Sequence, residues 1–400
     1  MKKFDIIIIG GGPAGLSALY FLSLNGYDVC LIERGKSYRE RIVEKTPYNI
    51  ANGIGGAGLF SDGKYSFPPS ASFLWTETNP DQLKKAYESI RALVKSIGME
   101  FPKWSSSWVE VKNRAYEKKD YNSIYFPDEK QYQLTELLLG NMTHTHHGVE
   151  AVSISKREES YIIEDSLNLR YAADYVIVAT GKHGANLLLK SSLQTQPAFK
   201  EEVGVRIECD SEVFLPFADK TIDYKLIKAI DCNTEARTFC CCKEGRILES
   251  CTKHYHSFNG TKWENSCRSN IGILIRTESP NSVYHKEIFD ILSAPKYVTS
   301  SLLDFINGEF TAIGPNCDKA IKSMISYIID TSQLSKLRSA LIVSPEIEYI
   351  GNYPVFNSAT LSLPGERVWV VGDVSGKYRG LLPALISGAY AAFAIQGDEK

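Results

Sequence analysis

The sequence predicts an α/β fold in which a mixed α+β domain is inserted into a domain built on a parallel sheet. Three observations carry this prediction. An apolar run over residues 4–9 ends at a group of glycines and is followed by an apolar helical stretch and a second run over 28–33. A similar run over 368–371 also ends in glycine, and the middle of the chain contains alternating stretches such as "VGVRIE" and "IGILIRT". Short apolar runs bounded by glycine are typical of buried parallel strands, and alternation is typical of strands buried on one face.

The composition limits the class of partner. The 400 residues are 44% hydrophobic, which is enough for a substantial core. The net charge is −2, from 45 basic and 47 acidic residues without a long run of either sign. This balance favours neither a nucleic acid nor an anionic membrane, so we expect a small-molecule partner. The oligomeric state is not indicated.

Two further features bear on the cellular location. No window approaches about 18 uninterrupted apolar residues, the nearest being "ALISGAYAAFAI" at 384–395, and Asp5 interrupts the apolar start of the chain. The nine cysteines, an odd number, suit reduced thiols better than a disulfide framework. We therefore expect a cytoplasmic protein without a membrane-spanning segment.

The first segment has the pattern of a dinucleotide-binding unit, because a strand, a glycine turn, a helix and a second strand follow one another. The turn is Gly10-Gly11-Gly12-Pro13-Ala14-Gly15. Gly10 permits the tight turn, Gly12 lets the backbone approach a pyrophosphate, and Gly15 lets helix and strand pack closely. The helix N-terminus offers N–H groups to the phosphates. Glu33 ends the second strand, where it can accept hydrogen bonds from a ribose diol, and Arg34 follows it. NAD and FAD use the same cradle, so this unit alone does not choose between them.

The C-terminal segment predicts a second part of the same site. The strand over 368–371 breaks at Gly372-Asp373, and a glycine-containing loop leads to a small-residue helix from Leu385 onward. A carboxylate at the end of a strand, followed by a helix aimed back at it, suits a polyol or an anion. The candidate residues of this segment are Gly372, Asp373, Gly380, Leu381, Leu382 and Pro383.

These segments resemble the flavoproteins with the glutathione-reductase type of FAD fold. The stretch "ADYVIVATGKHG" at 173–184 is similar to the strand exit that such proteins place beside the cofactor, and its candidates are Ala179, Thr180 and Gly181. The resemblance implies a Rossmann-like FAD-binding domain with a parallel sheet and a β-meander, and FAD as cofactor. It also implies that Gly372-Asp373 holds the ribityl chain, that the following helix points at the pyrimidine end of the flavin, and that Val149 lies at the adenine edge.

The sequence more closely resembles a group of uncharacterised FAD-dependent dehydrogenases. Three segments carry this resemblance: "GGAGLFSDGK" at 55–64, "GVRIE" at 204–208 and "TFCCCKEG" at 238–245. The function of that group is largely unassigned, so the resemblance indicates the cofactor rather than the reaction.

The glycine-rich loop over residues 52–67 is then interpreted as the segment that wraps the flavin. Glycines let the main chain lie along the phosphates and the isoalloxazine, while three polar side chains face the cofactor. Lys64 near the N1 and C2 oxygen region would favour the anionic reduced form, and a solvated loop charge is the alternative. The loop residues assigned to the cofactor are Gly55, Gly56, Ala57, Ser61, Asp62, Gly63 and Lys64.

The predicted domain order alternates. The FAD-binding domain comprises residues 1–100, 131–198 and 344–400, and the substrate domain comprises 101–130 and, as a sheet-based lid, 199–343. The region from about residue 201 to 341 lacks a second G-x-G-x-x-G. Reduction of the flavin is therefore expected from the substrate, from NAD(P)H bound without a second Rossmann unit, or from a protein donor.

The cysteines and histidines of the middle region do not predict a metal site. Zinc or an iron–sulfur cluster could draw ligand atoms from a set of cysteines and histidines, namely Cys240, Cys241, Cys242, Cys251, His254, His256 and Cys267. Metal motifs place cysteines in C-x-x-C pairs, however, and the three adjacent cysteines of the expected strand point to alternating faces, so we expect a packing role. We also expect no metal at the histidines at 144, 146 and 147, which we interpret as a surface cluster. Disulfide exchange with the flavin is disfavoured because the chain has neither C-x-x-C nor C-x4-C.

The candidates for proton transfer are His183, His256, Tyr378 and Arg379, and Arg379 could instead bind a substrate carboxylate. The leading hypothesis is an FAD-dependent oxidoreductase, a dehydrogenase or reductase, that transfers a hydride between flavin N5 and a small organic substrate or NAD(P)H. One alternative is an FAD-dependent monooxygenase acting through a C4a-hydroperoxide. Another is an RNA-modifying or non-redox flavoprotein, against which the balanced charge argues.

Overall fold

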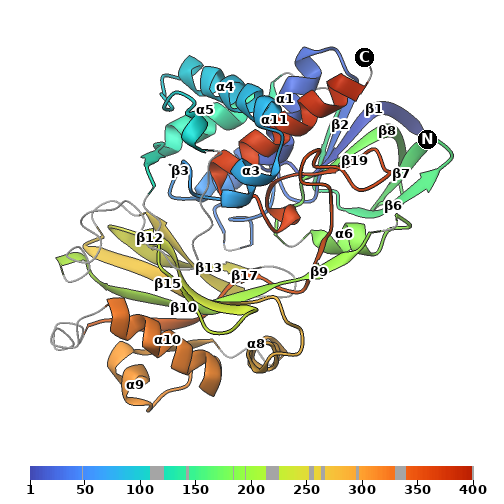
Figure 1. The fold of residues 1–400 in the computed structure, drawn as a ribbon. Coiled ribbons are helices and arrows are strands. Elements are labelled where there is room, and N and C mark those ends of the chain that lie inside the picture. Colours follow the sequence, from blue (N-terminus) through green and yellow to red (C-terminus); the bar gives the residue numbers. More distant parts are fainter. Residues whose placement is uncertain are drawn as a thin grey trace. The chain divides into compact units, whose positions relative to one another are not determined.

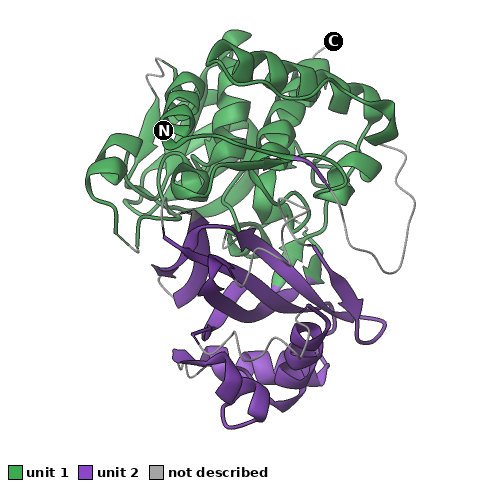
Figure 2. Ribbon diagram, turned by 90° about the vertical axis from the view of Figure 1, so that its left-hand side faces the viewer, with its two compact units in different colours: residues 1–112, 123–198, 352–400 green, residues 113–122, 199–351 purple. Residues whose placement is uncertain are grey.

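The computed structural model divides into two compact units (Figures 1 and 2). Unit 1 comprises residues 1–112, 123–198 and 352–400, and unit 2 comprises residues 113–122 and 199–351. The residues described by the structure are 1–46, 48–108, 121–140, 144–182, 184–193, 195–212, 225–251, 256–262, 266–293, 297–328 and 339–398.

This division differs from the predicted domain segments in two places. Most of 101–130, which we expected in the substrate domain, belongs to unit 1, and residues 344–351, which we expected in the FAD-binding domain, belong to unit 2. The second difference has a clear cause, because the strand β17 (Leu341–Tyr349) continues through residue 344 and pairs inside the sheet of unit 2. The functional assignment of the segments stays a prediction.

Unit 1 is built on a sheet that combines parallel strands with a meander, as predicted. The strand β1 (Lys2–Ile9) pairs in parallel with β2 (Val29–Glu33) and β8 (Arg170–Val178). Its residues from Ile6 to Ile9 are buried, which explains an uninterrupted apolar run. The first half of β8 pairs antiparallel with the meander, and its last three residues pair in parallel with β19 (Val368–Val370). The N-terminal and C-terminal parts of the chain therefore meet in one sheet.

On one side of this sheet, the helix α11 (Leu381–Asp398) packs against both α1 (Pro13–Leu24) and α4 (Pro80–Ser96) (Figure 1). The helix α11 begins at Leu381, four residues earlier than predicted. The remaining elements of unit 1 are α2 (Tyr38–Val43), η1 (Gly56–Phe60), β3 (Lys64–Ser66), α3 (Ser72–Glu77), η2 (Ser106–Trp108), β4 (Ser123–Tyr125), α5 (Asp128–Leu139), β5 (Thr145–His147), β6 (Ala151–Arg157), β7 (Ser160–Asp165), α6 (Ala185–Leu189), β9 (Pro197–Phe199), β18 (Asn352–Pro354) and η4 (Gly372–Ser375).

Unit 2 is an antiparallel sheet with helices on one face. The strand order is β11-β12-β15-β10-β17-β16, and a separate pair, β13 and β14, forms a hairpin. Its elements are β10 (Glu201–Asp210), β11 (Ile227–Ala229), β12 (Thr234–Cys242), β13 (Gly245–Cys251), β14 (His256–Lys262), β15 (Arg268–Thr277), α8 (Val283–Ser293), β16 (Val298–Ser301), α9 (Leu302–Asn307), α10 (Pro315–Ile328) and β17.

The alternation of β10 explains how this sheet is covered. Val203, Val205 and Ile207 point into a core that also contains Phe305 of α9 and Ile321 of α10. The intervening residues of β10 point to the opposite face, because successive side chains of a strand alternate. The alternating pattern of "VGVRIE" therefore separates an apolar face, which packs on helices, from a face that carries charged groups.

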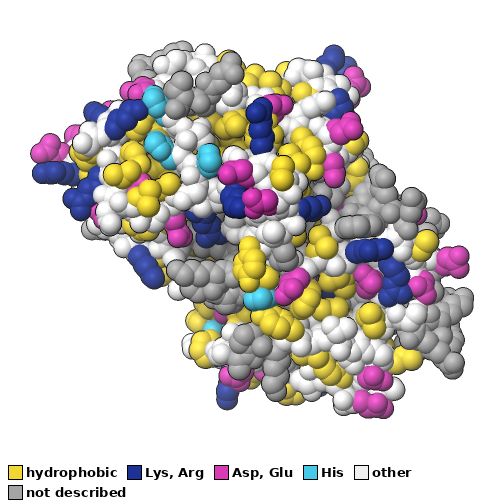
Figure 3. All heavy atoms as spheres, turned by 180° about the vertical axis from the view of Figure 1, so that it is seen from behind, with side chains coloured by type: hydrophobic (Ala, Val, Ile, Leu, Met, Phe, Trp, Pro, Cys, Tyr) yellow, Lys and Arg dark blue, Asp and Glu magenta, His cyan; other side chains and the backbone are white. Residues whose placement is uncertain are grey.

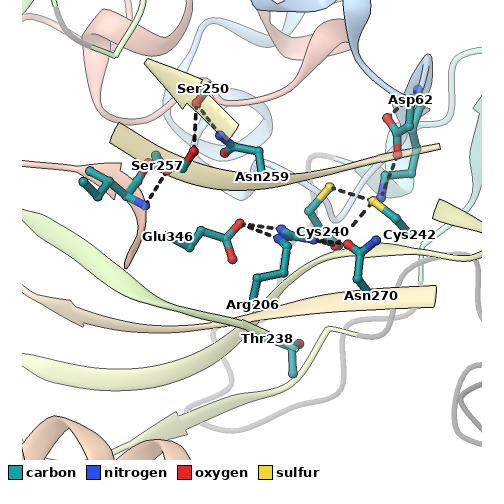
Figure 4. A network of polar contacts seen from close by, with 12 residues as sticks. Asp62, Arg206, Thr238, Cys240, Cys242, Ser250, Ser257, Asn259, Asn270 and Glu346 are labelled. Carbon is teal, nitrogen blue, oxygen red and sulfur yellow. Dashed lines mark hydrogen bonds and ion pairs between the residues drawn. The ribbon is translucent and has the colours of Figure 1, made fainter. Parts of the chain in front are cut away.

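Arg206 lies at the centre of the charged face and is buried (Figure 4). Its Nε donates a hydrogen bond to Glu346 Oε1 at 3.2 Å, and its Nη2 donates to the same oxygen. Its Nη1 donates to the backbone oxygen of Cys240 at 3.0 Å and to Asn270 Oδ1 at 2.6 Å. A Cβ on Gly260 of the hairpin would lie 2.2 Å from Nη1, so the hairpin packs directly on this side chain. Residues from the "GVRIE" and "TFCCCKEG" segments thus meet at one buried cation.

Charged side chains are dispersed over the face drawn in Figure 3, where Lys and Arg lie among Asp and Glu. Among the described residues, no helix is both long enough and apolar enough to cross a membrane.

Replacing Arg206 with methionine should lower the free energy of unfolding by about 3–5 kcal/mol, because Glu346 would stay buried without its cation. Burial raises the pKa of Glu346 and the Arg206 charge opposes that change, so loss of the cation removes what favours the ionised carboxylate. The double variant Arg206→Met/Glu346→Leu buries neither charge and should recover most of the loss. Thermal and denaturant unfolding would measure the stability of the single and the double variant, with Lys228→Met, at an exposed side chain, as control. A double variant as unstable as Arg206→Met would contradict this explanation.

Candidate cofactor site

The glycine turn between β1 and α1 contains glycines of two kinds. A Cβ on Gly10 would lie 2.4 Å from the carbonyl oxygen of Ala179, and a Cβ on Gly15 would lie 1.9 Å from the carbonyl oxygen of Gly10. Packing of the protein itself therefore excludes a side chain at these positions. Gly12 is different, because its φ is −78° and the only atom that its Cβ would approach within 4 Å is the Cα of Gly56, at 3.8 Å. The protein does not require a glycine there.

This difference matches what a pyrophosphate needs. Gly12 and Pro13 are only partly buried, and they begin the helix α1, whose first turn carries no acidic residue. Bare backbone at a helix N-terminus attracts an anion through N–H groups and the helix dipole. The residues present therefore fit a dinucleotide.

The glycine loop lies directly on this turn. Gly55 N–H donates a hydrogen bond to the carbonyl oxygen of Gly11 at 2.7 Å, and a Cβ on Gly56 would lie 2.9 Å from the Cα of Gly12. The next residue, Ala57, is exposed. The prediction that this loop faces the same ligand as the first glycine turn is thus supported by the contact between the two segments.

Arg41 of α2 holds the loop in place, and the sequence analysis did not identify it. Its side chain is fully buried, and all of its five N–H groups donate to backbone carbonyl oxygens. Nε donates to Asn49, Nη1 to Gly53 and Ile54, and Nη2 to Ile50 and Gly56, at distances from 2.6 to 3.3 Å. Burial lowers the pKa of Arg41 to about 10, and the charge of Glu33 opposes that change. An arginine in "YRERIVEK" has the appearance of a surface residue, so its sequence carries no indication of this role.

Glu33 joins three loops through backbone hydrogen bonds. Its Oε2 accepts from Gly11 N–H at 2.7 Å, and its Oε1 accepts from Gly35 at 2.8 Å and from Gly53 at 3.1 Å. We predicted Glu33 as a ribose ligand, and the structure adds a second task, since the carboxylate fixes the end of β2 against both glycine segments. The contact of Glu33 with the ribose stays a prediction, in which a ribose hydroxyl donates to Oε2 beside the bond from Gly11 N–H.

The C-terminal segment joins the same group of residues. A Cβ on Gly372 would lie 2.9 Å from the Cβ of Ala14, and Gly372 N–H donates to Ser387 Oγ of α11 at 2.9 Å. A Cβ on Gly58 would lie 2.7 Å from Leu381, the first residue of α11. Both glycine segments and the start of α11 are therefore in contact. Gly380 precedes α11 with φ of +108°, and Leu382 and Pro383 are buried in its first turn.

The polar part of the loop is less exposed than a solvated loop would be. The Lys64 side chain is 8% exposed and that of Asp62 is 10% exposed, with Lys64 Nζ 3.7 Å from Asp62 Oδ2. Lys64 is therefore largely buried in this structure, and its assignment to the cofactor stays a prediction. Ser61 Oγ donates to the Gly58 carbonyl at 2.9 Å, and a Cβ on Gly63 would lie 2.2 Å from the Phe126 carbonyl oxygen.

Three further candidates lie at the edges of this group. Ala179 N–H donates to the carbonyl of Ile9 at 2.8 Å, so the 179–181 exit adjoins the glycine turn. Val149 lies between β5 and β6 rather than in a strand, and its N–H donates to the carbonyl of Glu33 at 3.1 Å. Arg34 is exposed and donates through Nε to Asn52 Oδ1 at 3.1 Å.

The described catalytic candidates belong to both units. Tyr378 is buried beside the C-terminal cofactor segment, where burial raises the pKa of its hydroxyl, and Arg379 Nε lies 3.8 Å from Asp373 Oδ1. His256 belongs to the hairpin of unit 2. His183 lies outside the described residues.

A model of the family described as pyridine nucleotide-disulphide oxidoreductase matches residues 4–212, more than half of the chain. No curated protein sequence matches.

Several solved structures are similar at low identity. They include a flavoprotein/dehydrogenase from Cytophaga hutchinsonii (13% identity, covering 100% of this chain and 79% of that chain, TM-score 0.44). A geranylgeranyl bacteriochlorophyll reductase-like protein from Thermoplasma acidophilum has 12% identity, coverage of 100% and 80%, and a TM-score of 0.45. The 2,6-dihydroxypyridine-3-hydroxylase from Arthrobacter nicotinovorans has 14% identity, coverage of 99% and 83%, and a TM-score of 0.46. Values this low say nothing about the reaction of this chain.

The two kinds of glycine give a matched pair of variants. Gly12→Ala should change the stability of the cofactor-free protein by less than about 0.5 kcal/mol, because its Cβ meets open space. It should weaken dinucleotide binding about tenfold or more, because the methyl group occupies the approach of the pyrophosphate. Gly15→Ala should instead destabilise the cofactor-free protein by about 1–3 kcal/mol or more through the clash with Gly10. Denaturant unfolding and FAD titration would separate the two; equal loss of stability in both variants would contradict the assignment of Gly12.

Arg41→Lys tests whether the five hydrogen bonds fix the loop. Lysine keeps the charge but cannot reach five carbonyls, and each lost bond to a charged group is worth about 1.5–3 kcal/mol where the partner stays buried. Amide hydrogen exchange over residues 49–60 should become faster, and FAD binding should weaken. Arg39→Lys, at a side chain that is 78% exposed, is the control. Unchanged exchange in Arg41→Lys would show that the loop is held by other contacts.

Proposed function

The chain belongs to the pyridine nucleotide-disulphide oxidoreductase family and is an FAD-dependent oxidoreductase, and from this premise we propose that it transfers a hydride between the flavin and a small organic substrate or NAD(P)H. The observation that carries the proposal is Gly12. Its side-chain direction is open, it begins the helix α1, and the one atom that its Cβ would approach within 4 Å belongs to Gly56 of the glycine loop. A backbone platform of this kind suits a cofactor with a pyrophosphate.

In this proposal, each segment of unit 1 binds a different part of FAD. The N-terminus of α1 holds the pyrophosphate, Glu33 binds the adenosine ribose, and Asp373 binds the ribityl chain. The first turn of α11 is directed at the pyrimidine end of the flavin. The contacts of Gly372 with Ala14 and of Gly58 with Leu381 support this division, because they bring the start of α1 and the start of α11 together.

Lys64 is the residue that we assign to the reduced flavin. Its ammonium group is largely buried, and a cation in a partly desolvated site attracts the negative charge that the flavin gains on reduction. Bound FAD supplies the capacity to accept and pass on a hydride. The surrounding protein contributes a fixed positive charge at Lys64 and a neutral phenol at Tyr378, which can donate a proton.

The family's description names a pyridine nucleotide and a disulphide, and neither identifies the electron donor of this chain. The sequence contains no C-x-x-C or C-x4-C pair, so a disulfide next to the flavin is not part of the proposal. The region from about residue 201 to 341 contains no second G-x-G-x-x-G, so NAD(P)H would bind without a Rossmann unit of its own. We propose unit 2 as the domain that selects the substrate.

Anaerobic stopped-flow spectroscopy on the purified protein tests the proposal. Mixing with NADH and then with NADPH should bleach the flavin absorbance with one of the two, and deuterium at the transferred position should slow the bleaching. The variant Gly12→Ala, mixed with excess FAD, serves as a control that shows how fast flavin that is not bound to the protein is reduced. A protein that neither carries nor takes up FAD would refute the proposal.

The remaining outcomes choose between branches of the reaction. Bleaching followed by oxygen uptake that depends on an organic substrate would identify a monooxygenase. Absence of bleaching by either nucleotide would leave a dehydrogenase that is reduced by its own substrate.

A further inference from the structure

Three side chains with metal-binding donor atoms meet at the hairpin of unit 2. Cys251 Sγ lies 3.2 Å from His256 Nδ1, and the same nitrogen lies 2.8 Å from Glu249 Oε1. The ligand atoms of all three residues lie within 4.8 Å of one another. This group belongs to unit 2, whereas the proposed cofactor residues belong to unit 1.

The strand geometry accounts for the grouping. Glu249 and Cys251 are two residues apart on β13, so their side chains point to the same face. His256 is the partner of Cys251 in the antiparallel register between β13 and β14. Side chains of directly opposed residues are close neighbours on one face of a hairpin. The three donors therefore come together because of the backbone pairing.

The arrangement differs from a nucleophile relay. In a relay, a histidine binds the carboxylate through one ring nitrogen and the nucleophile through the other. Here one nitrogen, Nδ1, faces both the carboxylate and the thiol. Donors that face one common point suit a bound cation.

The distances are compatible with zinc after a small expansion. Bond lengths of about 2.3 Å to sulfur and about 2.0–2.2 Å to nitrogen or oxygen place neighbouring tetrahedral ligands about 3.4–3.6 Å apart. The observed separations of 3.2 and 2.8 Å are shorter than these ligand–ligand distances by about 0.2–0.8 Å. Rotation of the partly exposed Glu249 and His256 side chains, 43% and 35% exposed, can supply this change without a shift of the backbone.

The surroundings resemble a site with one open position. Cys251 is 4% exposed, so the thiol lies on the protein side while the other two donors face solvent. The ring of Tyr297 lies 4.9 Å from the His256 ring, centroid to centroid, and limits its orientations. Thiolate, imidazole and carboxylate are the three protein ligands that zinc uses, and three of them leave a fourth position for water.

We propose that Glu249, Cys251 and His256 form a binding site for a divalent transition-metal ion, with Zn²⁺ as the ion that fits best. On binding, the Cys251 thiol loses its proton to solvent and the sulfur, the His256 nitrogen and the Glu249 oxygen each donate an electron pair to the metal. The ion links the end of β13 to the start of β14. In this assignment His256 is a metal ligand, in place of the proton-transfer role that its sequence position suggested.

The test uses the full-length, tag-free flavoprotein after treatment with a chelator and dialysis. Zinc is titrated in competition with a chromophoric chelator, and Co²⁺ is titrated separately to detect sulfur-to-cobalt charge transfer and tetrahedral d–d bands. We expect one zinc ion per chain and a cobalt spectrum with a thiolate contribution. Glu249→Gln, His256→Asn and Cys251→Ser should each weaken zinc binding by about tenfold or more.

Two control variants test whether other thiols or carboxylates of unit 2 bind the zinc. Cys232→Ser removes an exposed thiol, and Glu278→Gln removes an exposed carboxylate, both within unit 2, and neither should change the affinity. Glu249→Gln and His256→Asn alter partly exposed side chains, so they keep the test valid even if Cys251→Ser fails to fold, and flavin content and circular dichroism report folding.

Two results would overturn the proposal. One is wild-type protein that binds zinc no more tightly than the variant His256→Asn/Glu249→Gln. The other is stoichiometric binding that survives in His256→Asn with full affinity, because the metal would then lie on other thiols. Loss of zinc binding without loss of flavin reduction would separate this site from the proposed function.

Discussion

The arrangement of unit 1 depends on the hydrogen bonds between the buried guanidinium of Arg41 and the backbone of the glycine loop. Glycine-rich segments lose much conformational entropy when they become ordered, so a loop of this composition needs a strong external restraint. Arg41 supplies it, since its planar group meets five carbonyl oxygens at once. With the loop fixed, Gly55 and Gly56 can lie on the first glycine turn, and Gly58 can meet the start of α11. Together, these contacts form the backbone surface that we propose for the cofactor.

Unit 2 uses a buried arginine in a different way. Arg206 is paired with a buried carboxylate, Glu346, whereas the cation of Arg41 meets backbone dipoles. A buried ion pair costs desolvation of two charges, and replacement of both by apolar groups is often tolerated. Carbonyl oxygens of a loop cannot be replaced in this way, because they belong to the main chain. Arg206 therefore organises one face of a sheet, while Arg41 determines the course of a segment that has no regular structure of its own.

Much of the fold followed from the sequence, because its main elements have strong local patterns. The glycine turn, the apolar strands and the alternating strands of unit 2 were predicted from residue types and spacing, and the parallel sheet and meander are confirmed. The contacts that make the site were harder to predict. The role of Arg41 depends on burial, and its neighbours along the chain are polar and charged. The meeting of Glu249, Cys251 and His256 depends on strand register, which the spacing of the three residues does not reveal.

The parallel pairing of β8 with β19 affects how the chain acquires its structure. Residues 176–178 of β8 are separated by almost two hundred positions from their partner strand, and all of unit 2 after residue 199 lies between them. Until β19 arrives, one edge of β8 has unpaired N–H and C=O groups over an apolar stretch, the kind of edge that pairs with other chains. The interval is long because contacts of high sequence separation form slowly. When many copies of the chain are synthesised at once, we expect aggregation through this edge. Pairing of β19 with β8 and packing of α11 should remove the exposed edge.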